Sequence, residues 1–209
     1  MDFTFDVIDA EEHDRLHSLY DPFAQAIRDL IDAAIHTGAD ADTIGDAQAA
    51  IEAVTATLQR TRHNGSGRLR HADTGRPVVW ANPVIGTRNA IAPPLDIHHD
   101  GTGRCWSEFE LGAAYEGPPG WVHGGICALV LDHILGEAAS AGLTKPLFTG
   151  TISCKYLRGT PLGRLRVEAF IERRDGIKTF ARGYIRDDEG VTVEADGVFI
   201  LPAWARDDA

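Results

Sequence analysis

The sequence has few cysteines and no long hydrophobic run, and both absences exclude whole classes of protein. Its 209 residues hold three cysteines, an odd number without a CxxC pair, and no stretch of about 18 apolar residues. Neither a disulfide framework nor a membrane-spanning helix is therefore predicted. Cys105, Cys127 and Cys154 lie in apolar strand or helix patterns, and we interpret them as buried thiols.

Basic residues are scarce in the first third of the chain. Residues 1–63 carry 13 acidic side chains against four arginines, a net charge of −9, whereas the whole chain has −11. A surface of this sign repels phosphate backbones, so a nucleic acid partner is not expected. The acidic N-terminus also lacks the positive region of a secretory signal, so we expect a cytoplasmic protein with no membrane partner.

The same first third has the sequence pattern of helices. Asp9 and Glu12 have capping-box spacing, and Asp21-Pro22 predicts a second helix start, so two helices are expected before Gly38. A third helix is predicted from about Thr43 to Arg60. Its apolar residues fall on one stripe, which predicts that the helix docks on another surface. These residues are Ile44, Ala47, Ile51, Val54 and Leu58.

Asn64-Gly65-Ser66-Gly67 interrupts the helical pattern and divides the chain. We predict a helical N-terminal extension over residues 1–63, a linker over residues 64–81 and the main domain over residues 82–209. A chain of this size can bury a sufficient core without disulfides or metal.

The main domain is predicted to contain one helix among strands. From Leu95 onward a period of two predicts a hairpin over DIHH and RCWSEFEL, followed by a helix from His123 to about Ala141. Because this helix is apolar on nearly all sides, it must be enclosed. We predict an α+β fold in which a curled antiparallel sheet wraps around the central helix. The remaining strands are expected at residues 148–157, 165–173, 178–186 and 191–201.

Asp132 is the one carboxylate inside the apolar first half of the predicted central helix. Desolvating an ionised carboxylate without a partner costs several kcal/mol or more, so the group must be paired, protonated or used in chemistry. We interpret it as catalytic. The alternative is a buried carboxylate that is hydrogen-bonded for structural reasons.

The motifs around this helix resemble those of one known family. The chain reads YEGPPGWVHGG over residues 115–125, places Asp132 nine residues after His123, and continues with Thr149, a turn from Tyr156 to Gly163 and a DGIKTF hairpin. This pattern resembles the PaaI-like hotdog-fold acyl-CoA thioesterases. The resemblance implies a hotdog fold, hydrolysis of an acyl-CoA with no cofactor besides the coenzyme A of the substrate, and a homodimer or a dimer-of-dimers tetramer.

The residues suit thioester hydrolysis, which needs a base or nucleophile and donors for the carbonyl oxygen. Asp132 would attack directly or activate a water. Free amides at Gly124 and Gly125, at the positive end of the helix, can donate hydrogen bonds to an oxyanion. The alternative reason for two glycines here is close packing of the helix against a strand, and both reasons can hold together. His123 either contacts the substrate or caps the helix. The resemblance implies that Thr149 orients the water or the aspartate, and its alternative is an ordinary strand residue.

Asp132 and the helix start are too far apart to share one thioester within a chain. Seven residues separate Gly125 from Asp132, which is about 10 Å along a helix axis. We therefore predict that two protomers lie side by side, so that Gly124 of one faces Asp132 of the other.

Strand alternation assigns the residues around Thr149 to two faces. It places Thr149, Thr151, Ser153 and Lys155 on one face, and Ile152, Cys154 and Tyr156 on the face towards the helix. The resemblance implies that coenzyme A phosphates bind near four cations, which are otherwise solvated surface charges. These cations are Lys155, Arg158, Arg174 and Lys178.

No metal is predicted. Adjacent strand residues such as His98 and His99 point to opposite faces, and the pair His133 and Glu137 has no evident third ligand. Two other functions remain open, a hotdog hydratase or dehydratase and a non-catalytic acyl-CoA-binding regulatory protein.

Overall fold

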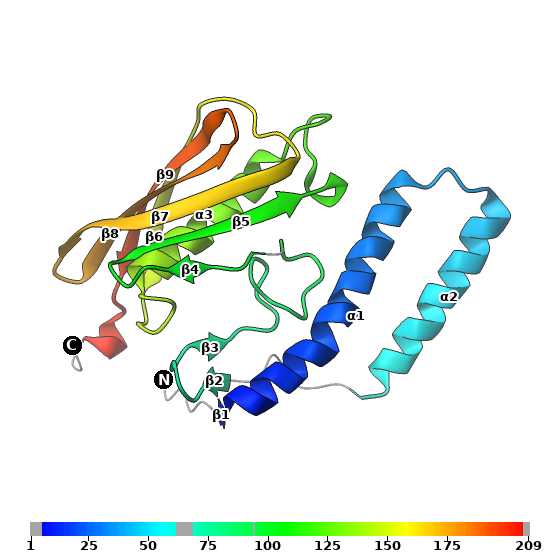
Figure 1. Ribbon diagram of the computed structural model, residues 1–209, viewed down its shortest axis with the longest axis horizontal. Coiled ribbons are helices and arrows are strands. Elements are labelled where there is room, and N and C mark those ends of the chain that lie inside the picture. The colour runs from blue at the N-terminus through cyan, green and yellow to red at the C-terminus, as the bar shows by residue number, and fades with distance from the viewer. Residues whose placement is uncertain (1–5, 62–68, 94, 207–209) are drawn as a thin grey trace.

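A computed structural model describes residues 6–61, 69–93 and 95–206, and its main body is a sheet wrapped around one helix (Figure 1). The predicted break at Asn64–Gly67 lies outside the described residues. The boundaries at residues 64 and 82 stay a prediction.

Six strands form the main sheet, and all neighbouring strands are antiparallel. Their order is β4-β5-β7-β8-β9-β6, so the strand that follows the central helix crosses to the far edge. The predicted hairpin and the four later strands are confirmed. The strands are β4 (His98–His99), β5 (Arg104–Leu111), β6 (Phe148–Tyr156), β7 (Gly163–Asp175), β8 (Lys178–Asp187) and β9 (Gly190–Ile200).

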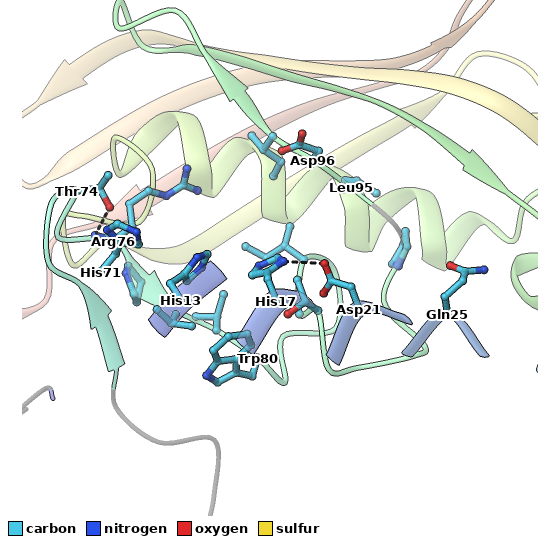
Figure 2. A pocket seen from close by; sticks show the side chains of 18 of the residues that line it. His13, His17, Asp21, Gln25, His71, Thr74, Arg76, Trp80, Leu95 and Asp96 are labelled. Atoms are coloured by element: carbon cyan, nitrogen blue, oxygen red, sulfur yellow. Dashed lines mark hydrogen bonds and ion pairs between the residues drawn. The ribbon is translucent and has the colours of Figure 1, made fainter. Parts of the chain in front are cut away.

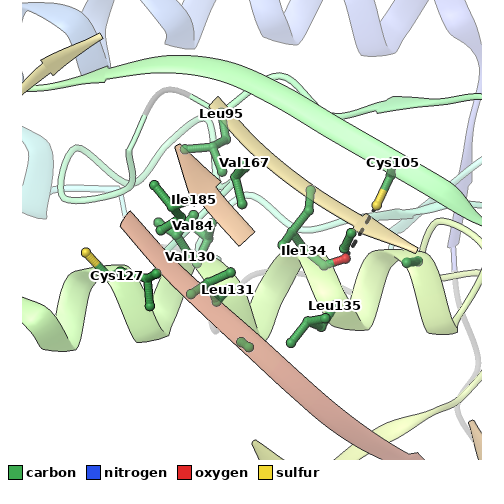
Figure 3. Close-up of a cluster of buried hydrophobic side chains, with 14 of the residues drawn as sticks. Val84, Leu95, Cys105, Cys127, Val130, Leu131, Ile134, Leu135, Val167 and Ile185 are labelled. Carbon is green, nitrogen blue, oxygen red and sulfur yellow. Dashed lines mark hydrogen bonds between the residues drawn. The ribbon is translucent and has the colours of Figure 1, made fainter. Parts of the chain in front are cut away.

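The central helix α3 (Gly124–Ala139) lies against the concave side of this sheet and supplies much of the core (Figure 3). Its buried residues Val130, Leu131, Ile134 and Leu135 are fully enclosed. The strands contribute alternate residues, as the inward Cys105 and the other buried positions of β5 show. The α+β hotdog architecture predicted from the sequence is therefore confirmed.

One long helix replaces the two that were expected before Gly38. Helix α1 (Ala10–His36) runs without interruption through Pro22, so the second start at Asp21 was wrong. Proline removes one helical hydrogen bond. Tertiary contacts are present on either side of it: Ala24 is fully buried, and the Arg88 guanidinium lies over the Tyr20 ring at 3.6 Å from its centroid.

A small second sheet combines one strand that precedes α1 with two strands that follow α2 (Ala41–Gln59). It joins β1 (Asp6–Ile8), β2 (Leu69–His71) and β3 (Pro77–Val78) in that order. Short 3₁₀ turns are present at Ala113–Tyr115 and Ala203–Ala205.

The third predicted helix is present as α2 (Ala41–Gln59). It runs beside α1 on the outside of the molecule (Figure 1) and buries none of its residues. The docking expected from its apolar stripe is therefore not seen among the described residues.

A buried ion cluster fastens the N-terminal part of the chain to α3. Glu137 is fully buried, and Nη2 of Arg76 lies 3.0 and 3.1 Å from its two carboxylate oxygens. Nε2 of His99 is 3.2 Å and Nε2 of His133 is 3.6 Å from the same carboxylate. Burial alone would raise the pKa of Glu137, but the two imidazoles and the guanidinium outweigh it and lower the pKa to about 2.

Replacing Glu137 by glutamine should destabilise the protein at pH 7 by about 3 kcal/mol, because it leaves the Arg76 charge without its partner. The folded pKa of about 2 is below the ordinary value of 4.5. The carboxylate therefore stabilises the fold above pH 4.5, and this stabilisation is lost as the pH falls towards 2. Urea unfolding at pH 7 and pH 3 measures it. The exposed Glu110→Gln is the matched control, and an equal Glu137→Gln effect at both pH values would contradict the assignment.

Candidate active site

Asp132 lies in the middle of α3 and is paired with a strand residue. The Thr149 hydroxyl of β6 donates a hydrogen bond to Oδ1 of Asp132 at 2.9 Å. Asp132 is half-buried and Thr149 is exposed, so the pair opens towards the free edge of the sheet. Oδ2 of Asp132 has no hydrogen-bond partner among the described residues.

Strand alternation gave the wrong face for Thr149. A β-bulge between Thr149 and Thr151 inserts one residue, which turns the Thr149 side chain towards α3. The inserted residue is Gly150, where a Cβ would lie 2.6 Å from Cδ1 of Ile200. Ile152 and Cys154 pack against the core, as predicted.

The start of α3 provides one unused amide. Nδ1 of His123 accepts a hydrogen bond from the Gly125 amide at 3.0 Å, so His123 caps the helix and the free amide expected at Gly125 is occupied. A neutral imidazole that accepts at Nδ1 carries its proton on Nε2. Among the described residues, the Gly124 amide has no acceptor. It is available for a ligand oxygen.

Tyr156 contacts the helix start, and the sequence had assigned it only to the helix-facing side. Its hydroxyl donates to the Gly124 carbonyl at 2.7 Å, and its ring lies 3.4 to 3.5 Å from the Cβ position of Gly124. Partial burial raises the pKa of the Tyr156 phenol. Two sequence features could have predicted this contact: Tyr156 is the first residue of the turn motif, and strand alternation places it on the side of β6 that faces the helix.

The four predicted cations fall into two groups. Lys155 and Arg158 lie at the Tyr156 end of β6, whereas Arg174 and Lys178 lie at the β7–β8 turn, near the Phe148 end. Arg158 is engaged with Asp187, and it donates to the Gly190 carbonyl at 3.0 Å. One chain therefore does not bring the four cations together.

A hollow of about 880 Å³ lies elsewhere, between α1 and residues 71–97 (Figure 2). Its lining includes His13, His17 and His71 but none of the predicted catalytic residues. Within the described ranges, no group of three or more histidine, cysteine or acidic side chains is arranged to hold a metal ion. None of the helices described is long and apolar enough to cross a membrane.

The sheet curled around α3, with an acid in mid-helix and an unused amide at its start, defines a protein of the hotdog fold. Residues 119–194 match the family model described as the thioesterase superfamily. The chain is 32% identical to protein RHA08564, a thioesterase superfamily protein whose crystal structure has a TM-score of 0.78, covering 87% of this chain and 90% of that one. The chain therefore belongs to the thioesterase superfamily.

Two further relatives share parts of this region. Acyl-coenzyme A thioesterase THEM4 of Xenopus laevis is 34% identical over 95 residues, which are 44% of this chain and 42% of that protein. The match thus spans less than half the length of this curated relative. Zebra fish thioesterase superfamily member 2 is 15% identical and shares the fold, with a TM-score of 0.51 over 59% of this chain and 91% of that one.

Proposed function

We propose that the protein is an acyl-CoA thioesterase that hydrolyses a thioester to a free acid and coenzyme A. The observation that carries the proposal is Asp132, held by Thr149 at an open sheet edge while the Gly124 amide is free. The carboxylate attacks the acyl carbon or removes a proton from the attacking water, and the carbonyl oxygen gains charge at the Gly124 amide. The thiolate of coenzyme A then leaves. If Asp132 has attacked the acyl carbon itself, a water then hydrolyses the anhydride formed on Asp132, which releases the free acid and restores the carboxylate.

The complete site requires two copies of the chain. Strand β6 is an edge strand of the main sheet, so its outer backbone groups can pair with a second β6. In one chain, Thr149 marks the Asp132 end of β6 and Tyr156 marks the Gly124 end. Antiparallel pairing of two β6 strands brings these opposite ends together, so Gly124 of one copy faces Asp132 of the other.

The same pairing would gather the cations. Lys155 and Arg158 of one copy come near Arg174 and Lys178 of its partner, although one chain keeps them apart. Four cations at one end of a shared site suit the phosphates of coenzyme A.

The test is thiol release from a panel of short, medium, long and aromatic acyl-CoAs. Turnover of at least one class supports the proposal and identifies the acyl group. If no thioester is turned over while acyl-CoA raises the melting temperature, the protein is a binding module rather than an enzyme.

The Thr149 hydroxyl should matter less than the acid that it positions. Thr149→Val removes the hydrogen bond to Asp132 at nearly constant shape, and we expect kcat to fall about tenfold, equivalent to about 1.4 kcal/mol. Thr149→Ser keeps the hydroxyl and should retain most of the activity. Steady-state kinetics on the best substrate measure both variants, and equal losses would contradict a role for the hydroxyl.

A further inference from the structure

Each helix of the hairpin formed by α1 and α2 carries a stripe of apolar residues that nothing in the described chain covers. The large residues of the two stripes are 38% to 57% exposed. They are Leu19, Phe23 and Leu30 of α1 and Ile44, Ile51, Val54 and Leu58 of α2. We refer to these seven residues as the hairpin stripe.

Helix α2 is poorly suited to exist without tertiary contacts. It contains Gly45 and three threonines, which lower helix stability, and it buries no residue. Most helical stability in proteins comes from packing of an apolar face rather than from the helix propensity of the residues. Ile44, Ile51 and Leu58 repeat at seven residues with Val54 between them, the spacing at which one helix packs along another.

We propose that the hairpin stripe is covered by the hairpin of a second copy of the chain, so that two hairpins form an antiparallel four-helix bundle. The short connection over residues 37–40 already makes α1 and α2 antiparallel neighbours. The seven side chains, each about half exposed, offer on the order of 500 Å² per chain. Two copies would therefore bury about 1,000 Å², the lower limit for a specific interface.

The charges of the hairpin favour a second copy over a basic partner. The acidic residues of α2 are Asp42, Asp46 and Glu52, and helical geometry places all three well away from the stripe. The positions that flank the stripe on α2 are neutral, including Gln48, Ala50 and Thr55. The α2 part of the stripe can therefore meet its own copy without repulsion at the contact.

This interface is separate from the β6 edge. In the strand order β4 and β6 are opposite edges of the sheet, and the hairpin lies on the β4 side (Figure 1). Pairing at β6 and packing of the hairpins would thus be two separate twofold contacts. They join four copies in a closed assembly when their twofold axes cross at right angles, which is the arrangement we propose.

Sedimentation and light scattering test the interface with two matched variants of the full chain. Ile51→Gln with Leu58→Gln disrupts the stripe, and Ala49→Gln with Ala56→Gln makes the same change one heptad apart on the opposite face of α2. We expect four copies of the 22.6 kDa chain for the wild type and the control, and two copies with unchanged thiol release for the stripe variant. If the wild type has two copies and the stripe variant has one, the result supports the hairpin interface and contradicts pairing at β6.

Equal masses for the wild type and the stripe variant would overturn the proposal, whether α2 closes on α1 or binds another protein. A second measurement needs no substitution. Hydrogen exchange of the α2 amides should speed up when the wild type is diluted, while α3 stays protected. Exchange of α2 that does not depend on concentration would also overturn it.

Discussion

Replacing Asp132 by asparagine should abolish thiol release, with kcat lowered by about 1,000-fold or more. Asparagine has nearly the same shape, and its Oδ1 can still accept the hydrogen bond from the Thr149 hydroxyl. The fold should therefore be unchanged. The variant lacks only the negatively charged carboxylate that attacks the acyl carbon or deprotonates the water. Steady-state thiol release on the best acyl-CoA, with the melting temperature measured in parallel, gives the result.

The matched control for Asp132→Asn is Asp196→Asn, because Asp196 is an exposed carboxylate of the same sheet that pairs with Arg182 on its surface. We expect wild-type turnover from it. If Asp132→Asn keeps its activity, the carboxylate is structural and the proposed chemistry is wrong. If Asp132→Asn loses activity but its melting temperature still rises with acyl-CoA, Asp132 acts in the chemical step and is not needed for substrate binding, as proposed.

The central part of the fold could be predicted because its signals are local. Alternation in β5, turn residues between the later strands and the apolar α3 each specify their own element, and an apolar helix must be enclosed. The continuous α1 could not be predicted, because contacts with distant residues decide it. Pro22 removes one helical hydrogen bond. The contact of the Arg88 guanidinium with Tyr20 and the burial of Ala24 stabilise the helix on either side of it, and neither contact can be read from the sequence around Pro22.

The candidate site was predictable in composition but not in geometry. The motif gave Asp132, Thr149 and the helix start, yet a single inserted residue at Gly150 reverses the face on which Thr149 lies. The Gly125 amide donates to the ring of His123 rather than remaining free for a ligand oxygen. The residue types alone do not show which of these two acceptors the amide has. The pairing of Arg76 with Glu137 spans 61 residues and has no periodic signal.

Gly124→Pro should lower kcat by about 100- to 1,000-fold, because it removes only the amide proposed to bind the oxyanion. Gly124 is the first helical residue, where proline is well tolerated. The preceding His123 has φ −59° and ψ 131°, the extended conformation that a residue before proline requires. Gly124→Ala keeps the amide, and its Cβ would make ordinary contact with the Tyr156 ring. The alanine variant should stay within a few-fold of the wild type.

Combining the two inactive variants tests whether the site is shared. In a dimer of one Asp132→Asn chain and one Gly124→Pro chain, one site carries both substitutions and the other carries neither. Random pairing should therefore restore roughly a quarter of wild-type turnover on co-expression, although each variant alone is inactive. If Asp132 and Gly124 of the same chain served one site, every site would carry one substitution and no activity would return. Recovery of turnover thus requires sites that combine Asp132 of one chain with Gly124 of the other. The distance between Gly124 and Asp132 along α3 leads to the same arrangement.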